Sequence, residues 1–287
     1  MRIVMNKNII SRLKKVRHGN ELNSTLSSLP MVAKKILFIA MSKINTKDDI
    51  DDNSIFYVTS EEYSNWTGIK NNNAYKELKE GSEILNQVVL KLTREDVLML
   101  SDGVNLSFNE KNAPTGLNLN LTEFTLYYKN EGRVGLRFTK LTKSFLCKLI
   151  GVEKKYTTQV LLSAVRVKTP SGSTLYQLIR KKFSSNPHVN HFDITIDELK
   201  DELCLYSIQN GKKTYKYEQY PIFKRDFLNK AVNDIKKNTE VKEISYEVVG
   251  KIGRKTDKLR FHYQLESIPE LSDEQKNLLK ELDEKGI

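Results

Sequence analysis

The sequence predicts an α+β protein that contains two similar units in tandem, each with several helices and a small antiparallel sheet. One observation is a basic amphipathic helix within residues 215–240, followed by two alternating apolar runs that indicate a hairpin up to residue 264. A second is that the order helix, strand, helix, helix, hairpin occurs twice, at about 30–138 and 170–264. Helices that lead into a basic-tipped hairpin are typical of winged-helix domains. The predicted fold class is therefore two tandem winged-helix domains with small antiparallel sheets.

The charge distribution favours nucleic acid as the partner. The chain has 287 residues, 39% of them hydrophobic, and a net charge of +11. Residues 1–19 carry six basic side chains and no acid, and residues 211–260 carry fourteen basic side chains against seven acidic ones. Such clusters attract polyanions by counterion release, whereas a membrane surface would require an apolar face beside them. Without a long apolar run or a signal-peptide pattern, we expect a cytoplasmic protein with no membrane partner.

The first unit is expected over residues 20–152, after a basic arm at 1–19 that is either a solvated terminus or a segment that contacts phosphates. In chain order we expect helices over 23–44, a strand at 55–58, a helix capped by Thr59 or Ser60 and ended by Gly68, and a helix at 72–85. Strands at 88–92, 98–100, 117–128 and 134–138 and a helix at 143–150 are expected after them. The long alternating strand at 117–128 leaves two interpretations open, a dimer interface or a buried sheet.

The helix at 72–85 occupies the position of a DNA-reading helix in the first unit. Lys70, Asn72 and Lys76 are its candidate DNA contacts. Acidic residues at 77, 80 and 83 balance their charge. This helix is therefore either a second DNA helix or a structural relic of the duplication.

The second unit is expected over residues 153–265, before an acidic tail at 266–287 with a net charge of −4. An alternating segment at 156–167 precedes a helix that opens at Thr169-Pro170. A strand at 192–196 and a short helix capped by Asp197 follow. The basic amphipathic helix and the hairpin then complete a second winged helix.

The candidate DNA contacts of the second unit lie on the basic helix and on the hairpin, which would form the wing. On the helix, Arg225, Asn229, Lys230 and Asn233 are expected to face the major groove. At its entrance we expect contacts from Lys216, Tyr217 and Lys224, although the helical phase of Lys224 points toward the packed face. At the hairpin tip, Lys251, Arg254 and Lys255 are expected to hold the phosphate backbone.

No motif for catalysis is present. The chain lacks a G-x-x-x-x-G-K-[ST] phosphate loop, and no serine or cysteine has a recognisable base nearby in sequence. The pair His188 and His191 has the wrong spacing for a metal-dependent nicking enzyme, and Cys147 and Cys204 lack metal-ligand spacing. We therefore expect no enzyme activity, no cofactor and no metal.

Four stretches resemble the iteron-binding plasmid replication initiators, or Rep proteins. They are GNELNSTLSSLPMVAKKILFIA, LRFTKLTKSFLCKLIGVEKKYTT, SGSTLYQLIRKKF and FKRDFLNKAVNDIKKNTEVKEISYEVVGKIGRKTDKLRFHY, within a resemblance that covers about residues 17–265. The last is the most specific, because a helix with A-x-x-[DE]-I precedes a strand and a G-R wing in that order. Asp226 departs from the pattern, since the family often has another basic residue there, and Pro170-Ser-Gly172 replaces a more helical run.

The resemblance implies an initiator that binds direct repeats at a plasmid origin as a monomer and represses its own promoter as a dimer joined through the first unit. It also implies that strand opening comes from binding and bending of double-stranded DNA, with the host initiator, helicase and primase recruited by contact. A winged-helix transcriptional regulator without origin function is the alternative. A rolling-circle nicking enzyme is a third hypothesis, which requires a covalent tyrosyl-DNA adduct.

Overall fold

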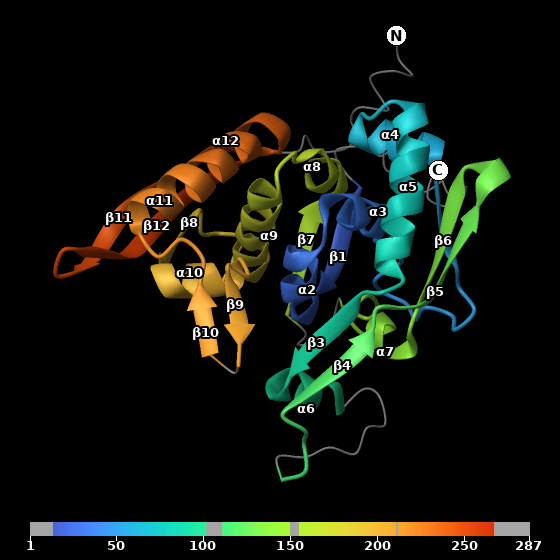
Figure 1. Cartoon of the computed structure of the whole chain (residues 1–287), viewed down its shortest axis with the longest axis horizontal. Helices are drawn as coiled ribbons and strands as arrows, with labels where there is room; N and C mark the ends of the chain where they lie inside the picture. Colours follow the sequence, from blue (N-terminus) through green and yellow to red (C-terminus); the bar gives the residue numbers. More distant parts are fainter. Residues whose placement is uncertain (1–13, 102–110, 150–154, 211, 267–287) are drawn as a thin grey trace.

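Two units of similar topology lie side by side in the computed structural model, which describes residues 14–101, 111–149, 155–210 and 212–266 (Figure 1). All strand pairs in these ranges are antiparallel, and they form two three-stranded sheets and three two-stranded ones. No helix within them is both long enough and apolar enough to cross a membrane.

The first unit is built around α3 (Met31–Met41), in which every side chain from Ile36 to Met41 is buried. Around it lie η1 (Asn20–Leu22), α2 (Asn23–Ser28), β2 (Phe56–Thr59), α4 (Ser60–Thr67), α5 (Asn71–Leu85), β5 (Thr122–Tyr128), η2 (Lys129–Glu131) and β6 (Arg133–Phe138). Helix α5 packs closely on α3, because Gly81 has no Cβ to collide with Ile36. Gly68, at φ +77°, ends α4 as expected.

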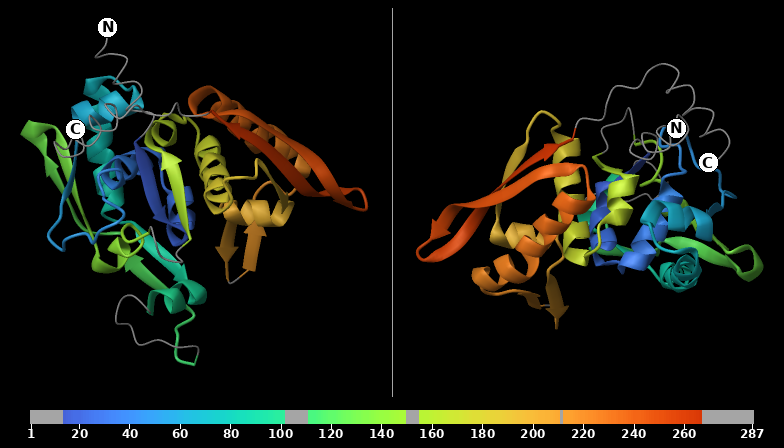
Figure 2. Two further views of the ribbon diagram at one scale, coloured as in Figure 1. Left: turned by 180° about the vertical axis from the view of Figure 1, so that it is seen from behind. Right: turned by 90° about the horizontal axis from the view of Figure 1, so that it is seen from above.

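The second unit is built around α9 (Pro170–Ser185), whose residues from Gly172 to Arg180 are all buried. Around it lie β8 (His191–Thr195), α10 (Ile196–Glu202), α11 (Tyr220–Phe223), α12 (Asn229–Asn238), β11 (Val241–Ile252) and β12 (Lys255–Leu265). A π-helical turn, Lys224–Leu228, joins α11 and α12 into one continuous helix. The hairpin β11-β12 extends from the body of the molecule as a long arm (Figures 1 and 2).

The same topology in both units confirms the predicted duplication. The sheet order is β2-β6-β5 in the first unit and β8-β12-β11 in the second, so the strand before the helices pairs with the last hairpin strand each time. A threonine follows at the same position: Thr59 caps α4 and Thr195 caps α10. The expected cap at Asp197 is wrong, because Thr195, two residues earlier, is the N-cap and forms a capping box with Glu198.

The N-terminal region departs from the predicted basic arm. Residues 1–13 lie outside the described part, but β1 (Lys15–Gly19) pairs with β7 (Tyr156–Val160) along its whole length. Val16 and His18 are fully buried in this ribbon, so the arm prediction is wrong for residues 15–19. This pairing also joins residues on both sides of the domain boundary predicted at 152/153. The position of that boundary stays a prediction. The tail beyond Glu266 is outside the described residues.

Three further elements of the first half differ from expectation. Residues 98–100 belong to helix α6 (Arg94–Ser101), not to a strand. The single strand expected at 117–128 is two strands in different sheets, because β4 (Gly116–Asn120) pairs with β3 (Val89–Thr93) and the chain turns at the buried Leu121. The helix expected at 143–150 is wrong over 144–149, because the helix here is the short α7 (Lys140–Lys143), capped by Thr139, and turns follow it; residue 150 lies outside the described residues. After β7 the chain forms α8 (Leu161–Arg166).

A two-stranded ribbon was also not predicted. Strands β9 (Tyr206–Gln209) and β10 (Lys212–Tyr215) lie between α10 and α11. In the first unit, only residues 68–70 separate the equivalent helices α4 and α5. The ribbon is thus an insertion that leads directly into the basic helix of the second unit.

Candidate nucleic-acid interface

The continuous helix from α11 to α12 has one packed face and one polar face. The packed face is made by buried apolar residues: Phe223, Phe227, Leu228, Ala231 and Ile235. The candidate DNA contacts are all exposed: Lys224, Arg225, Asn229, Lys230 and Asn233. A polar helix face that carries both cations and amides has the donors and acceptors that base edges require.

The π-helical turn explains the exposure of Lys224. In a regular α-helix, Lys224 lies three and four residues before Phe227 and Leu228 and would share their packed face. The wider turn at Lys224–Leu228 changes this phase, and Lys224 is exposed. Single π turns of this kind are frequent at functional sites.

Arg225 is held by the carboxylate next to it. Its Nε donates to Oδ1 of Asp226 at 2.9 Å, and its Nη2 donates to Oδ2 at 2.7 Å. The Nζ of Lys230 lies 3.9 Å from the same Oδ1. Arg225 lowers the pKa of Asp226 through these hydrogen bonds, so the carboxylate is ionised at neutral pH.

Asn229 is connected to the wing strand β11. The hydroxyl of Tyr246 donates to Oδ1 of Asn229 at 2.6 Å. Burial and the nearby Tyr220 raise the pKa of Tyr246 to about 12, so this hydroxyl keeps its proton at neutral pH. Because Oδ1 accepts this hydrogen bond, the orientation of the Asn229 amide is determined and its Nδ2 is the free end.

The residues at the helix entrance differ from one another. Lys216 is exposed, and its backbone N–H donates to the carbonyl of Leu205 at 2.8 Å. Tyr217 is half-buried with φ +56°, and its ring lies 5.9 Å from that of Phe223 and 6.1 Å from that of Phe227. The ring of Tyr217 therefore packs beneath the helix.

The candidate DNA contacts of the wing lie at its tip. Lys251, Arg254 and Lys255 are all exposed there. Gly253, at φ +59°, supplies the left-handed residue of the turn between β11 and β12. Ile252 is 70% exposed beside them, an apolar side chain that nothing in the described chain covers.

The equivalent helix of the first unit, α5, is less basic. Lys70, Asn72 and Lys76 are exposed at its start, and Lys70 is the N-cap residue. Glu80 and Glu83 are exposed on the same helix, and Glu77 accepts a hydrogen bond from the Tyr63 hydroxyl at 2.6 Å. Helix α5 thus offers some phosphate-binding groups but no cluster like that on α12.

Both halves of the chain match a known family. The family described as "Initiator Replication protein, WH1" matches residues 15–180, and "Initiator Rep protein, WH2" matches residues 195–263. The chain belongs to the replication initiator family. This assignment confirms the family and the tandem winged-helix fold that the sequence predicts.

Two relatives of this replication initiator share most of its length. It is 39% identical over 255 residues to the PI protein of Escherichia coli, a match that covers 88% of this chain and 84% of that protein. The crystal structure of the Pi initiator protein in complex with iteron DNA resembles it with a TM-score of 0.80 and 36% identity, over 88% of this chain and 98% of that one.

The β9-β10 ribbon gives this initiator additional positive charge beside the basic helix. Lys212, Lys213 and Lys216 lie on or just after β10, and residues 206–217 contain no acid. The Nζ of Lys213 forms an ion pair with Asp201. It also lies 4.5 Å from the ring centroid of Tyr206 and 5.0 Å from that of Tyr215. The Asn210-Gly211 pair between two short runs was the sequence signal for this ribbon.

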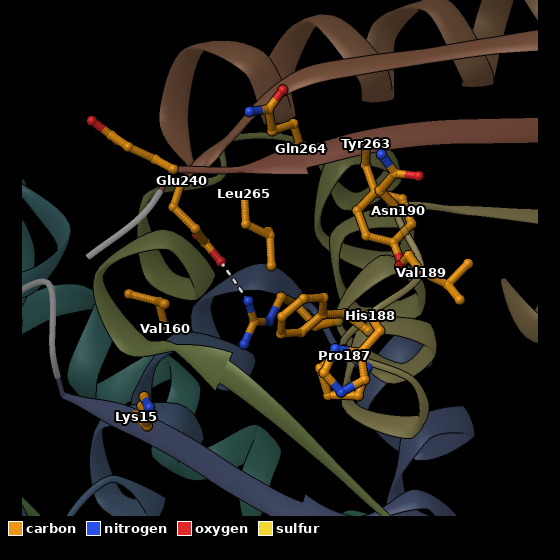
Figure 3. A pocket seen from close by; sticks show the side chains of 13 residues that line it. Lys15, Val160, Pro187, His188, Val189, Asn190, Glu240, Tyr263, Gln264 and Leu265 are labelled. Carbon is orange, nitrogen blue, oxygen red and sulfur yellow. Dashed lines mark hydrogen bonds and ion pairs between the residues drawn. The ribbon is translucent and has the colours of Figure 1, made fainter. Parts of the chain in front are cut away.

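A cavity of about 550 Å³ lies at the junction of the initiator's two units, between β1, β7, α9 and β12 (Figure 3). Glu240 lines it and accepts from Nη1 of Arg180 at 3.2 Å and from the Tyr176 hydroxyl at 2.9 Å. Nε of Arg180 donates to the carbonyl of Thr158 at 2.7 Å. These charges are paired within the protein, and they connect α9 to β7 and to the residue before β11.

One pair of residues in the initiator has the composition of a catalytic dyad. Nζ of Lys34 donates to Oγ of Ser173 at 3.2 Å, and burial lowers the pKa of Lys34 to about 7. Both side chains are buried between α3 and α9, where a substrate has no access. Among the described residues, no group of three or more histidine, cysteine or acidic side chains is placed to hold a metal ion.

Proposed function

We propose that this initiator binds direct repeats, or iterons, at a plasmid origin as a monomer, by sequence-specific contacts to double-stranded DNA. The observation that carries the proposal is the exposed face of α11–α12, which presents cations, the oriented amide of Asn229 and the amide of Asn233 above a packed apolar face. The likeness to the Pi protein, whose structure is a complex with iteron DNA, supports it.

The two groups of contacts have different roles. Arg225, Asn229, Lys230 and Asn233 read base edges in the major groove, with Lys216 and Lys224 at the helix entrance. The wing cations Lys251, Arg254 and Lys255 bind phosphates and set the register without reading sequence.

The first unit binds the DNA backbone and so supports the base readout by the second unit. Lys70, Asn72 and Lys76 of α5 are the contacts, since they are exposed at the start of that helix. Tyr217, whose ring packs on Phe223 and Phe227, supports the helix from below. Binding, not catalysis, is the activity of the chain.

The family resemblance extends the proposal to regulation and assembly. A dimer joined through the first unit represses the initiator's own promoter, in equilibrium with the monomer that binds iterons. The host initiator, helicase and primase are recruited to the opened origin in the bacterial cytoplasm, where the plasmid lies. The alternative is a transcriptional regulator with the same fold but without origin function.

A replication assay separates these two functions. A plasmid whose only origin is this gene with its flanking repeats is introduced into a host, and its copy number is measured. Replication that depends on the gene supports the initiator, and failure without a second initiator gene supports the regulator. DNA binding is tested separately by fluorescence anisotropy. A wild-type protein that binds repeat and scrambled duplexes equally overturns the proposed recognition of iterons.

A further inference from the structure

Asp226 is the acidic residue on the polar face of the helix that we propose enters the major groove. The other acid between residues 220 and 238, Asp234, is buried against α9. A carboxylate at a surface that meets DNA is repelled by the phosphates. Asp226 shares its face with the cations Arg225 and Lys230 and with the amides of Asn229 and Asn233. We therefore expect it to have a role in binding that offsets this repulsion.

The geometry of the Arg225–Asp226 pair indicates that role. The carboxylate takes the Nε–H and one Nη2–H, on one edge of the guanidinium. The two Nη1–H groups and the second Nη2–H stay free, and they form the fork that matches O6 and N7 of guanine. The Arg225 side chain is 74% exposed and that of Asp226 is 31% exposed, so the guanidinium stands further out than the carboxylate.

We propose that Asp226 is a positioning residue that holds Arg225 as a reader of guanine. The carboxylate limits the rotamers of Arg225 and keeps its free fork directed away from the helix. It also disfavours the movement of Arg225 to a phosphate, because that movement would leave Asp226 near the DNA backbone with only its longer ion pair to Lys230, at 3.9 Å. The inference rests on the proposed function, since it assumes that this helix face meets base edges.

Removal of the Asp226 carboxylate should strengthen non-specific binding and weaken sequence discrimination. Without the carboxylate, Arg225 becomes free to pair with phosphates, and the loss of one negative charge strengthens binding to any duplex. Discrimination at the guanine that Arg225 reads falls at the same time. A residue that served only to stabilise the helix would lower binding to all duplexes alike.

The test compares the wild type, Arg225→Ala, Asp226→Asn and Asp257→Asn. Asp226→Asn keeps the side-chain volume, and Asp257→Asn is the charge-matched control on β12. Affinities are measured by fluorescence anisotropy for the repeat duplex, for duplexes in which each G·C pair is replaced in turn by A·T, and for a scrambled duplex. The pair whose replacement weakens the wild type but not Arg225→Ala is the one that Arg225 reads.

Asp226→Asn is expected to lose about tenfold in discrimination at that pair and to keep discrimination at the other pairs. Asp257→Asn is expected to keep discrimination at all pairs, and to strengthen binding to the scrambled duplex about as much as Asp226→Asn does. Unchanged discrimination in Asp226→Asn, an equal loss at every pair, or the lack of any pair specific to Arg225 overturns the inference. If one of these results is found but the wild type still prefers the repeat to the scrambled duplex, only the role of Asp226 is wrong and the proposed function stands. If the wild type has no such preference, both the role of Asp226 and the proposed function are wrong.

Discussion

The carboxylate of Asp234 on α12 holds the first turn of α9 through Thr169. Oδ2 of Asp234 accepts from the backbone N–H of Thr169 at 2.7 Å and from its hydroxyl at 2.6 Å, and the N–H of Lys168 donates to both carboxylate oxygens at 3.1 and 3.2 Å. The Thr169 hydroxyl in turn caps α9 by accepting from the N–H of Gly172. The basic helix is thereby fixed to the central helix of its unit.

Replacing Asp234 by Ala should lower the free energy of unfolding by about 3 kcal/mol, because the partly buried N–H groups of Lys168 and Thr169 lose a charged acceptor. Urea denaturation measures the change. Glu218→Ala removes an exposed acid before the start of the same helix and is the control, with an expected change within about 0.5 kcal/mol. Equal effects of the two substitutions would contradict the structural role of Asp234.

Arg225→Ala and Lys255→Ala should weaken DNA binding in different ways. Arg225→Ala is expected to weaken binding to the repeat about tenfold or more while relaxing specificity, because a base contact is lost. Lys255→Ala should weaken repeat and scrambled duplexes alike and reduce the salt slope by about 0.9, as expected for one phosphate contact. Affinities at several salt concentrations distinguish the two. Equal, sequence-independent losses would remove Arg225 from base readout.

Tyr246→Phe should weaken specific binding about fivefold, since it removes the hydroxyl that orients Asn229. The ring, whose centroid lies 5.6 Å from that of Phe261, remains in place, so the hairpin should keep its stability. Binding to repeat and scrambled duplexes is compared with that of Asn229→Ala. If Tyr246→Phe still lowers specificity when Asn229 is already Ala, the two residues act independently and the prediction is wrong.

The buried His18 should make the protein sensitive to acid. Burial lowers the pKa of His18 from 6.5 to about 4, and its Nδ1 donates to the carbonyl of Gly19 at 3.0 Å while Nε2 accepts from Gln159 at 3.3 Å. Between pH 6.5 and 4 the unfolded chain binds a proton that the folded chain does not. Stability from this group is therefore complete above pH 6.5 and is lost as the pH falls toward 4, by about 3 kcal/mol.

The acid sensitivity is measured by urea denaturation at pH 6.5, 5 and 4. His18→Asn should show a smaller loss over this range than the wild type, whereas His188→Asn, at an exposed histidine, should behave as the wild type does. A pH profile of His18→Asn that matches the wild type would assign the acid loss to other groups.

Local patterns predicted some elements of this fold and not others. The helix containing Phe227, Ala231 and Ile235 and the strands that follow it were confirmed, since helical and alternating periodicities can be read from neighbouring residues. The apolar alternation of the segment at 117–128 continues across Leu121, so this pattern does not reveal that the segment divides between two sheets. Assigning Asp197 as a cap failed because Thr195, one residue before the helix, competes for the same N–H groups.

By itself, the sequence determined the two winged helices, the concentration of charge on the second one and the residues of its polar face. Only the tertiary structure decided which partners those residues have. Val16 is buried because β1 pairs with β7, about half the chain away, and Asn229 is oriented by Tyr246 from a different element. Such contacts depend on how the whole chain packs, whereas periodicity and charge are properties of short segments.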